Sequence, residues 1–443
     1  MSRSTHNPWR HRFAVLTALA TLGLVGMGGL VTSHGVGMAV PDWPTSYGYN
    51  MFALPVSTWL TGGIFHEHTH RLWASFVGVL VVALTRWLGG RESRRALTII
   101  GIAEVVLGWL LLWVSPDLKG AGHFLSGIGS VVLVAGIVWV KNGTAVRPLP
   151  KLGWWAFGLV QVQGLLGGLR VVLDAQVVAD LRLGTAFGIL HACLGQAFLA
   201  LLVVIALVTS RWWLERWAAA RRAGLLLEIE QRAAPAADTP IRWWFLAGTT
   251  LIVLQLVIAA TMRHKHAGLA ISDFPLAHGK LWPAMDAAAI QNYNAQRLET
   301  MAANPITAFQ IGLQMAHRLM ALAILVCVGA VAWRVRRSAE LQFCANRDDR
   351  NAPSRSSALQ LRRLAFLWLG LIFIQFGLGA WTIWSNKAAD VATAHVLVGA
   401  LSLVTGVLGC IICFRRLARV MEAQGASVAG VSCTDRPVIA TNS

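Results

Sequence analysis

Ten long apolar segments constrain the fold of this chain more than any other feature of its sequence. Each is about as long as the 20 residues that an α-helix needs to cross the hydrocarbon core of a bilayer. The segments are 13–33, 70–88, 97–115, 121–140, 152–171, 185–208, 243–262, 310–333, 363–384 and 392–414. Only 13% of the 443 residues are charged, about half the fraction that is usual in soluble domains. The sequence therefore predicts an all-α polytopic membrane protein.

The net charge of +18 is unevenly distributed between the two sides of the predicted membrane. With the N-terminus inside, the basic residues concentrate in the inner segments, most densely from Arg334 to Arg363. This asymmetry follows the positive-inside rule and predicts that both termini are cytoplasmic. It accounts for the basic charge without a nucleic-acid partner. We expect a bacterial plasma (inner) membrane rather than the mitochondrial inner membrane, because the N-terminus is too short for an obvious transit peptide.

The two halves of the chain carry the same motifs in the same order. Each half has a turn with an aspartate and a proline, then a helix that starts at a His-Arg pair. A helix with a glutamine-glycine pattern follows, and a histidine-led helix closes the half. These features lie at 37–48, 70–71, 163–167 and 191 in the first half, and at 268–279, 317–318, 375–379 and 395 in the second. An internal repeat of this kind fixes the architecture, and here it predicts two pseudo-symmetric four-helix transmembrane bundles.

Ten spans exceed two bundles of four by one pair, the segments 97–115 and 121–140. We interpret this extra helix pair, 97–140, as an insertion or a partial duplication. The expected organisation is an N-terminal bundle at 1–208, a cytoplasmic linker at 209–242, a C-terminal bundle at 243–416 and a disordered tail at 417–443. An amphipathic interfacial helix is expected in the linker, and disorder is also expected in the polar segment 338–360.

Four histidines are expected at one depth, near the outer ends of spans that run in the same direction. They are His70 and His191 in the first half and His317 and His395 in the second. The residue four positions after each is small, in chain order Ala74, Gly195, Ala321 and Gly399. Positions i and i+4 share a helix face, so a flat macrocycle could approach there. The pattern favours two bis-imidazole haem sites, with interhelical hydrogen bonds as the alternative for each histidine.

His123 also leads a predicted span and competes as a ligand in the first half. We prefer His191, because it is the histidine that His395 matches in the second half.

The halves differ three residues before the first histidine of each, where Glu67 corresponds to Gln314. A carboxylate beside a porphyrin in a low-dielectric site can move protons or stabilise positive charge, so Glu67 is the candidate catalytic residue. A helix N-terminal acid that the dipole favours is the alternative. Arg71 and Arg318 are candidate partners of haem propionates, with snorkelling to the interface as the alternative.

With E-x-x-H-R at 67–71, P-D-W-P at 41–44, the four histidines and the repeat, the chain resembles the heme A synthase family of cytochrome c oxidase assembly. The resemblance implies an iron-dependent oxidoreductase that converts the C8 methyl group of heme O to the formyl group of heme A. It implies heme b as a cofactor, held by His317 and His395. It further implies that His70 and His191 flank the substrate, with Glu67 as the essential acid, and that a heme O synthase is a neighbour.

Two features depart from the family pattern. The cysteine pair that many members carry around the proline-aspartate turn is replaced here by Val40 and Ser46, and the extra helices 97–140 lie outside the common eight-helix plan.

Two other functions fit part of the pattern. A diheme b-type membrane protein that only transfers electrons would explain the four histidines but not the difference between Glu67 and Gln314. A haem transporter or chaperone would suit the duplicated bundle, although no pair of short, broken helices is found at corresponding positions. The electron partner and the oligomeric state stay open, a homo-oligomer being one alternative.

Overall fold

The computed structural model describes residues 7–114, 119–138, 149–179, 181–215, 239–296, 305–345 and 353–429. Its elements are α1 (Pro8–Ser33), η1 (Met51–Ala53), α2 (Val56–Trp59), α3 (Gly62–Val114), α4 (Lys119–Ile137), α5 (Leu149–Val172), β1 (Val177–Val178), β2 (Leu181–Arg182), α6 (Leu183–Thr209), α8 (Thr239–His264), α9 (Ala287–Ala295), α10 (Ala308–Ala345), α11 (Pro353–Trp384) and α12 (Ala389–Ala429). Within these residues, 9 helices are long and apolar enough to cross a membrane. The prediction of an all-α polytopic membrane protein is confirmed.

Helix α3 accounts for the difference between ten expected spans and these nine helices. Its 53 residues contain the expected spans 70–88 and 97–115. A straight helix of that length would measure about 80 Å, more than twice the hydrocarbon thickness. The chain turns at Gly90, whose φ of 60° and ψ of -135° only glycine adopts readily. Arg86 and Ser93 donate hydrogen bonds of 3.0 Å to the Gly90 carbonyl, which satisfies that group in the turn.

Beyond Gly90, α3 packs against α4 through glycines. A Cβ added to Gly101 would lie 2.6 Å from the Cα of Leu133, and one added to Gly108 would lie 3.0 Å from the Cα of Ser126. The two helices are therefore antiparallel neighbours at close range, and they form the extra helix pair.

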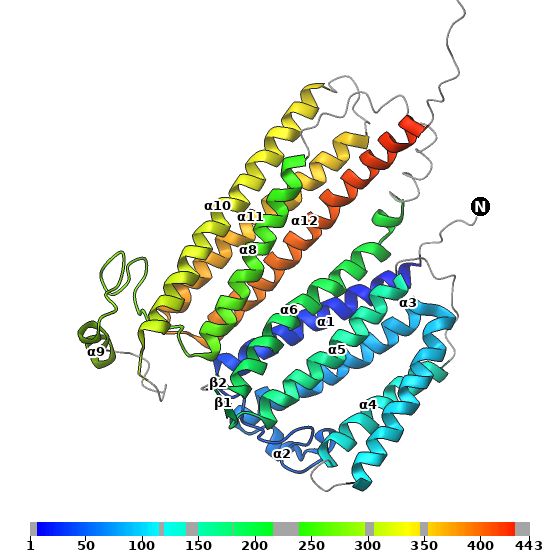
Figure 1. Ribbon diagram of the computed structural model, residues 1–443, viewed down its shortest axis with the longest axis vertical. Helices are drawn as coiled ribbons and strands as arrows, with labels where there is room; N and C mark the ends of the chain where they lie inside the picture. The colour runs from blue at the N-terminus through cyan, green and yellow to red at the C-terminus, as the bar shows by residue number, and fades with distance from the viewer. Residues whose placement is uncertain are drawn as a thin grey trace, which may run out of the picture.

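The remaining long helices form two rings of four. In the first ring, α1 contacts α3 and α6, and α5 also contacts both. In the second, α8 contacts α10 and α12, and α11 also contacts both. The rings meet through α1, α6, α8 and α12, and they lie side by side in Figure 1. Each ring has its own apolar core, and Trp368 in the second core is fully buried and stacked on Phe245.

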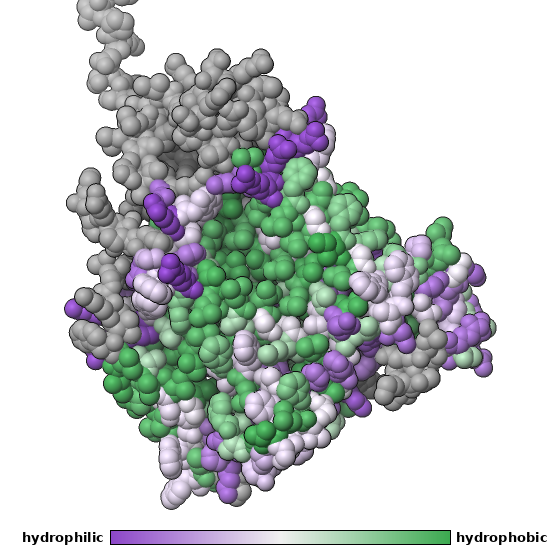
Figure 2. All heavy atoms as spheres, turned by 180° about the vertical axis from the view of Figure 1, so that it is seen from behind, coloured by the Kyte–Doolittle hydropathy of each residue, from purple (hydrophilic) through white to green (hydrophobic). Residues whose placement is uncertain are grey.

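Figure 2 shows a broad hydrophobic surface over one face of the molecule, with hydrophilic residues gathered at its margins. Large apolar side chains on the long helices stay exposed, Val326 and Phe373 among them. A soluble monomer rarely exposes a patch of this kind, whereas acyl chains cover it in a bilayer.

Three helices extend beyond the ends that the sequence predicted. Helix α10 continues to Ala345 and α11 begins at Pro353, so most of 338–360 is helical rather than disordered. Helix α12 continues to Ala429, so the tail expected to be disordered from 417 is helical up to that residue. Arg and Ala are the commonest residues in these extensions, and they are good helix formers once an apolar segment has started the helix. Residues 216–238, where the interfacial helix was expected, and 430–443 lie outside the described residues.

Candidate functional site

The four histidines occupy corresponding places in the two rings. His70 is on α3 and His191 on α6, two helices that both contact α1 and α5. His317 is on α10 and His395 on α12, which both contact α8 and α11. His70 and His191 lie within electrostatic range of each other. The ring centroids of His317 and His395 are 6.3 Å apart, at an interplanar angle of 53°.

This spacing fits a metal ion shared by two imidazoles. With metal–nitrogen bonds of about 2 Å, two such rings have centroids roughly 6 Å apart. In addition, the Nδ1 atoms of all four histidines are buried and find no hydrogen-bond partner among the described residues. Buried polar atoms are normally satisfied, so four unpartnered ring nitrogens at equivalent places indicate a missing ligand. The residues present therefore fit two bis-histidine haem sites.

Glycines on the neighbouring helices back three of the four rings. A Cβ added to the glycine would approach the ring Cε1 to 3.2–3.3 Å, tighter than ordinary van der Waals contact. The pairs are Gly28 with His70, Gly167 with His191, and Gly379 with His395. A larger residue would push the ring away, so these glycines fix how deeply each imidazole sits.

Glutamines also hold the histidine helices, a role that the sequence patterns did not reveal. Gln163 on α5 donates to the His191 carbonyl at 3.3 Å, and Gln255 on α8 donates to the His317 carbonyl at 3.0 Å. Each comes from a helix between the two histidine helices of its ring. The glutamine-glycine repeat was the available signal for Gln163, although it did not show what the amide contacts. Its counterpart Gln375 on α11 has Nε2 3.2 Å from His395 Nε2. Gln255 lies outside the repeat.

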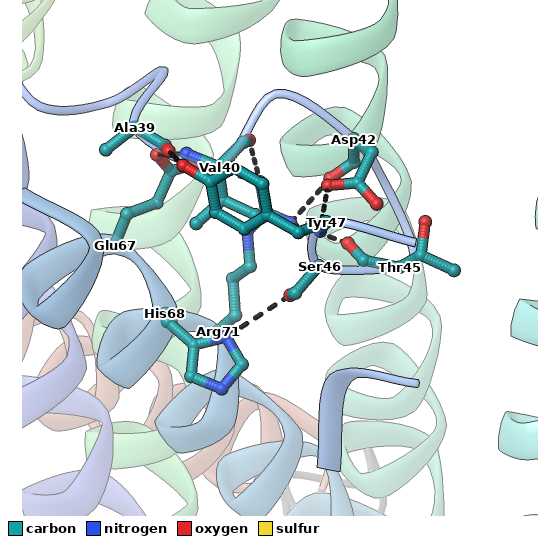
Figure 3. Close-up of polar contacts among 9 residues, drawn as sticks. All are labelled: Ala39, Val40, Asp42, Thr45, Ser46, Tyr47, Glu67, His68 and Arg71. Carbon is teal, nitrogen blue, oxygen red and sulfur yellow. Dashed lines mark hydrogen bonds and ion pairs between the residues drawn. The ribbon is translucent and has the colours of Figure 1, made fainter. Parts of the chain in front are cut away.

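Glu67 and Arg71 fix the loop after α1 onto the first turns of α3 (Figure 3). Glu67 Oε2 accepts from the Val40 N–H at 2.9 Å, and its Oε1 accepts from Arg71 Nη2 at 2.8 Å. Arg71 also donates to the carbonyls of Val40 (2.7 Å), Asp42 (2.6 Å) and Thr45 (3.1 Å). We call these contacts the first loop clamp. They place the Glu67–Arg71 ion pair, whose side chains are almost fully buried, at the end of the first ring where the loop after α1 lies.

The turn inside this loop is built on Asp42, which accepts from the N–H groups of Tyr47 (2.7 Å) and Gly48 (2.9 Å). Burial alone would raise the pKa of Asp42, but these hydrogen bonds and one from Thr45 outweigh it and lower the pKa below its ordinary value. Asp42 is therefore a charged turn residue.

The second ring holds its loop in the same way without the ionised pair. Gln314 Oε1 accepts from the Ile271 N–H at 2.7 Å, as Glu67 does from Val40. Its Nε2 donates to the carbonyls of Ile271 (3.1 Å) and Gly268 (3.2 Å). We call these contacts, with those of Arg318, the second loop clamp. Here an amide does the structural work of the carboxylate.

The two arginines expected to bind propionates donate to their loops instead. Arg318 gives Nη1 to the Leu276 carbonyl at 2.8 Å and Nη2 to the Asp273 carbonyl at 2.7 Å. Arg71 is occupied in the same way in the first loop clamp. The competing ligand His123 is exposed on α4, a helix outside the first ring, and is not brought to His70.

The chain is similar to the family described as cytochrome oxidase assembly protein over residues 123–407, a range that includes His191, His317 and His395 and begins after His70. It is 27% identical over 269 residues to a protein named heme A synthase from Caulobacter sp. (strain K31), covering 58% of this chain and 63% of that one.

Two further relatives carry the same name. The one from Symbiobacterium thermophilum is 31% identical over 264 residues, which are 58% of this chain and 67% of the relative. The one from Bradyrhizobium sp. (strain BTAi1) is 27% identical over 317 residues, which are 70% of this chain and 73% of the relative. The chain matches just under two thirds of the length of the Caulobacter protein.

Proposed function

Because the chain belongs to the cytochrome oxidase assembly family of the heme A synthases, we propose that it oxidises the C8 methyl group of heme O to the formyl group of heme A. It is an integral membrane protein of heme A biosynthesis. Its relatives are bacterial, which supports a location in a bacterial plasma membrane. A heme O synthase in the same membrane would supply the substrate.

The observation that carries this proposal is the double set of histidines, each with a buried, unpartnered ring nitrogen. We assign heme b to His317 and His395, and the substrate haem to His70 and His191. Bound there, heme b would supply one-electron redox chemistry. The protein's own contribution would be to hold each haem between the two histidine helices of its ring, with glycines behind His70, His191 and His395 setting the depth of these imidazoles.

Glu67 is the residue that we propose acts on the substrate side. Its carboxylate pairs with the guanidinium of Arg71 at 2.8 Å. Arg71 lies four residues further along α3 and directly follows His70. A fixed negative charge in a low-dielectric site stabilises positive charge that develops on the substrate, and a carboxylate can also accept the proton that the methyl group loses. Gln314 can do neither, which assigns the chemistry to the first ring.

The test is to express the protein in a membrane that makes heme O, purify it and identify the extracted haems by chromatography and mass. Heme A together with heme b supports the proposal. Heme b alone, at two per chain and unchanged when heme O is supplied, would replace it with a diheme electron-transfer protein. Heme O that is bound and released unchanged would indicate a carrier.

A further inference from the structure

Arg170 is a cation that neither loop clamp uses. It lies near the end of α5, half-buried, and it forms no hydrogen bond or ion pair within the described part of the chain. Glu67 and Asp174 lie in electrostatic range of it. Both Glu67 oxygens are already taken by Val40 and Arg71, and Asp174 forms no ion pair with Arg170 within the described residues. A guanidinium at the boundary of a bilayer without a bound anion is costly, so its place indicates a partner that is not part of the protein.

Its position points to the first histidine pair. Arg170 lies three residues after Gly167, the glycine behind His191, so it is one turn further along the same face of α5. It lies within electrostatic range of both His70 and His191. On its other side it packs under the loop after α1, where a Cβ on Gly37 would overlap Nη2 of Arg170. The guanidinium is thus held between the loop and the histidine pair.

The second ring has no equivalent of this cation on α11. Thr382, three residues after Gly379, takes the corresponding place and donates to the Leu378 carbonyl at 2.8 Å. The second ring has Arg263 on α8 instead, in electrostatic range of His395. Arg263 donates at 2.6 Å to both Gly29 O and Ser33 Oγ of α1, so it joins the two rings.

Arg170 and Arg263 also lie within electrostatic range of each other. Two like charges this close in a low-dielectric region are stabilised when anions lie beside them. A haem has two propionate carboxylates on one edge, and a carboxylate is the group that a guanidinium binds through two parallel hydrogen bonds.

We propose that Arg170, rather than Arg71, binds a propionate of the haem held between His70 and His191. The inference rests on the proposed function only in placing a haem in the first ring. Arg71 donates to three loop carbonyls and to Glu67, whereas the N–H groups of Arg170 have no hydrogen-bond acceptor within the described residues. The pairing orients the macrocycle, with its propionate edge toward the loop and the opposite edge deeper in the ring.

The test compares two probes, protohaem and its dimethyl ester, titrated by absorbance into the purified full chain with its resident haem in lipid nanodiscs. The wild type should bind protohaem at least about tenfold more tightly than the ester, because the ester has no carboxylate for a charge-assisted hydrogen bond. R170Q should lose this preference, binding both probes as the wild type binds the ester. R182Q, which changes an exposed arginine on β2, is the matched control and should keep the preference.

A second variant guards against misfolding of R170Q. G37A places a methyl group where the Arg170 guanidinium lies and should reduce the preference, whereas G158A, on α5 with nothing within 4 Å of the added Cβ, should not. A wild-type protein with no preference, or an R170Q and a G37A that both keep it, would overturn the inference. Conversion of heme O in that case would leave the proposed function standing. A preference for protohaem without conversion of heme O would support the carboxylate site and contradict the proposed synthase function.

Discussion

The two loop clamps perform one structural task with different chemistry. In each ring a side chain three residues before the histidine accepts from a loop N–H, at 2.9 Å for Glu67 and 2.7 Å for Gln314. In each, the arginine after that histidine donates to carbonyls of the same turn. Because Gln314 accepts from its loop N–H with a neutral amide, the acceptor at this position does not need a charge. The charge of Glu67 is therefore surplus to the clamp, and this surplus is what we connect with oxidation of the substrate.

The largest effect should come from the histidines, because loss of an axial ligand removes a bond to iron. H395A should purify without heme b, whereas H191A should keep heme b and lose the added haem. The measurement is the haem-to-protein ratio from the pyridine haemochrome spectrum, before and after addition of haem. H123A is the control and should match the wild type, since His123 is exposed on α4. Loss of heme b from H191A would reverse our assignment of cofactor and substrate.

Removing the arginine should cost more in the first clamp than in the second. R71Q leaves the buried Glu67 carboxylate without its ion partner, which should lower the free energy of unfolding by about 3–5 kcal/mol. R318Q loses two hydrogen bonds from a charged donor but breaks no ion pair, and the nearby Asp273 keeps its bonds from the N–H groups of His278 and Gly279. A loss of about 1.5–3 kcal/mol is therefore expected. Denaturant-induced unfolding in detergent, followed by circular dichroism, measures both. Equal losses would mean that the Glu67–Arg71 pair contributes nothing beyond neutral contacts.

Placing a carboxylate in the second clamp should have a smaller effect. Q314E cannot donate to the carbonyls of Gly268 and Ile271, which now face a carboxylate oxygen. We expect a loss of about 1–3 kcal/mol in the free energy of unfolding. The reciprocal E67Q should change stability less, because Gln314 shows that an amide satisfies the same kind of loop. An unchanged Q314E protein would show that the two clamps are interchangeable and would weaken the comparison.

The smallest effect concerns acid stability. Asp273 repeats the turn of Asp42, with N–H bonds from His278 (2.6 Å) and Gly279 (2.8 Å). Burial would raise its pKa, but these hydrogen bonds lower the pKa below its ordinary value, as in Asp42. Carboxyl groups with lowered pKa values stabilise the folded state above their ordinary pKa, about 3.9, and this stability is lost as the pH falls through the folded-state pKa. D42N and D273N should each make the denaturant midpoint of unfolding depend less steeply on pH below about pH 4. A D42N midpoint that falls with pH as steeply as that of the wild type would contradict this.

The sequence predicted those features of the fold that are set by patterns extending over many residues. Apolar runs of span length predicted the helices, and the repeat predicted which helices correspond, because both signals extend over tens of residues. The turn at Gly90 falls in the gap between the expected spans 70–88 and 97–115, where the sequence predicted that the chain reverses. The loop clamps were missed because they join Glu67 and Arg71 to backbone groups 26–31 positions away, and such contacts leave no local pattern. For the same reason the sequence pattern favoured Arg71 as a propionate partner and did not single out Arg170.

The most direct test of the central claim is turnover by E67Q, measured as heme A formed from heme O by chromatography and mass in membranes that make heme O. The account predicts that E67Q folds, keeps heme b and binds the substrate haem, yet forms heme A roughly 100-fold more slowly or not at all, because the amide keeps the clamp and removes the charge. Q314E, which changes the same position in the other ring, serves as the comparison and should still form heme A. Wild-type turnover by E67Q would contradict the account and leave Glu67 as a loop-holding residue.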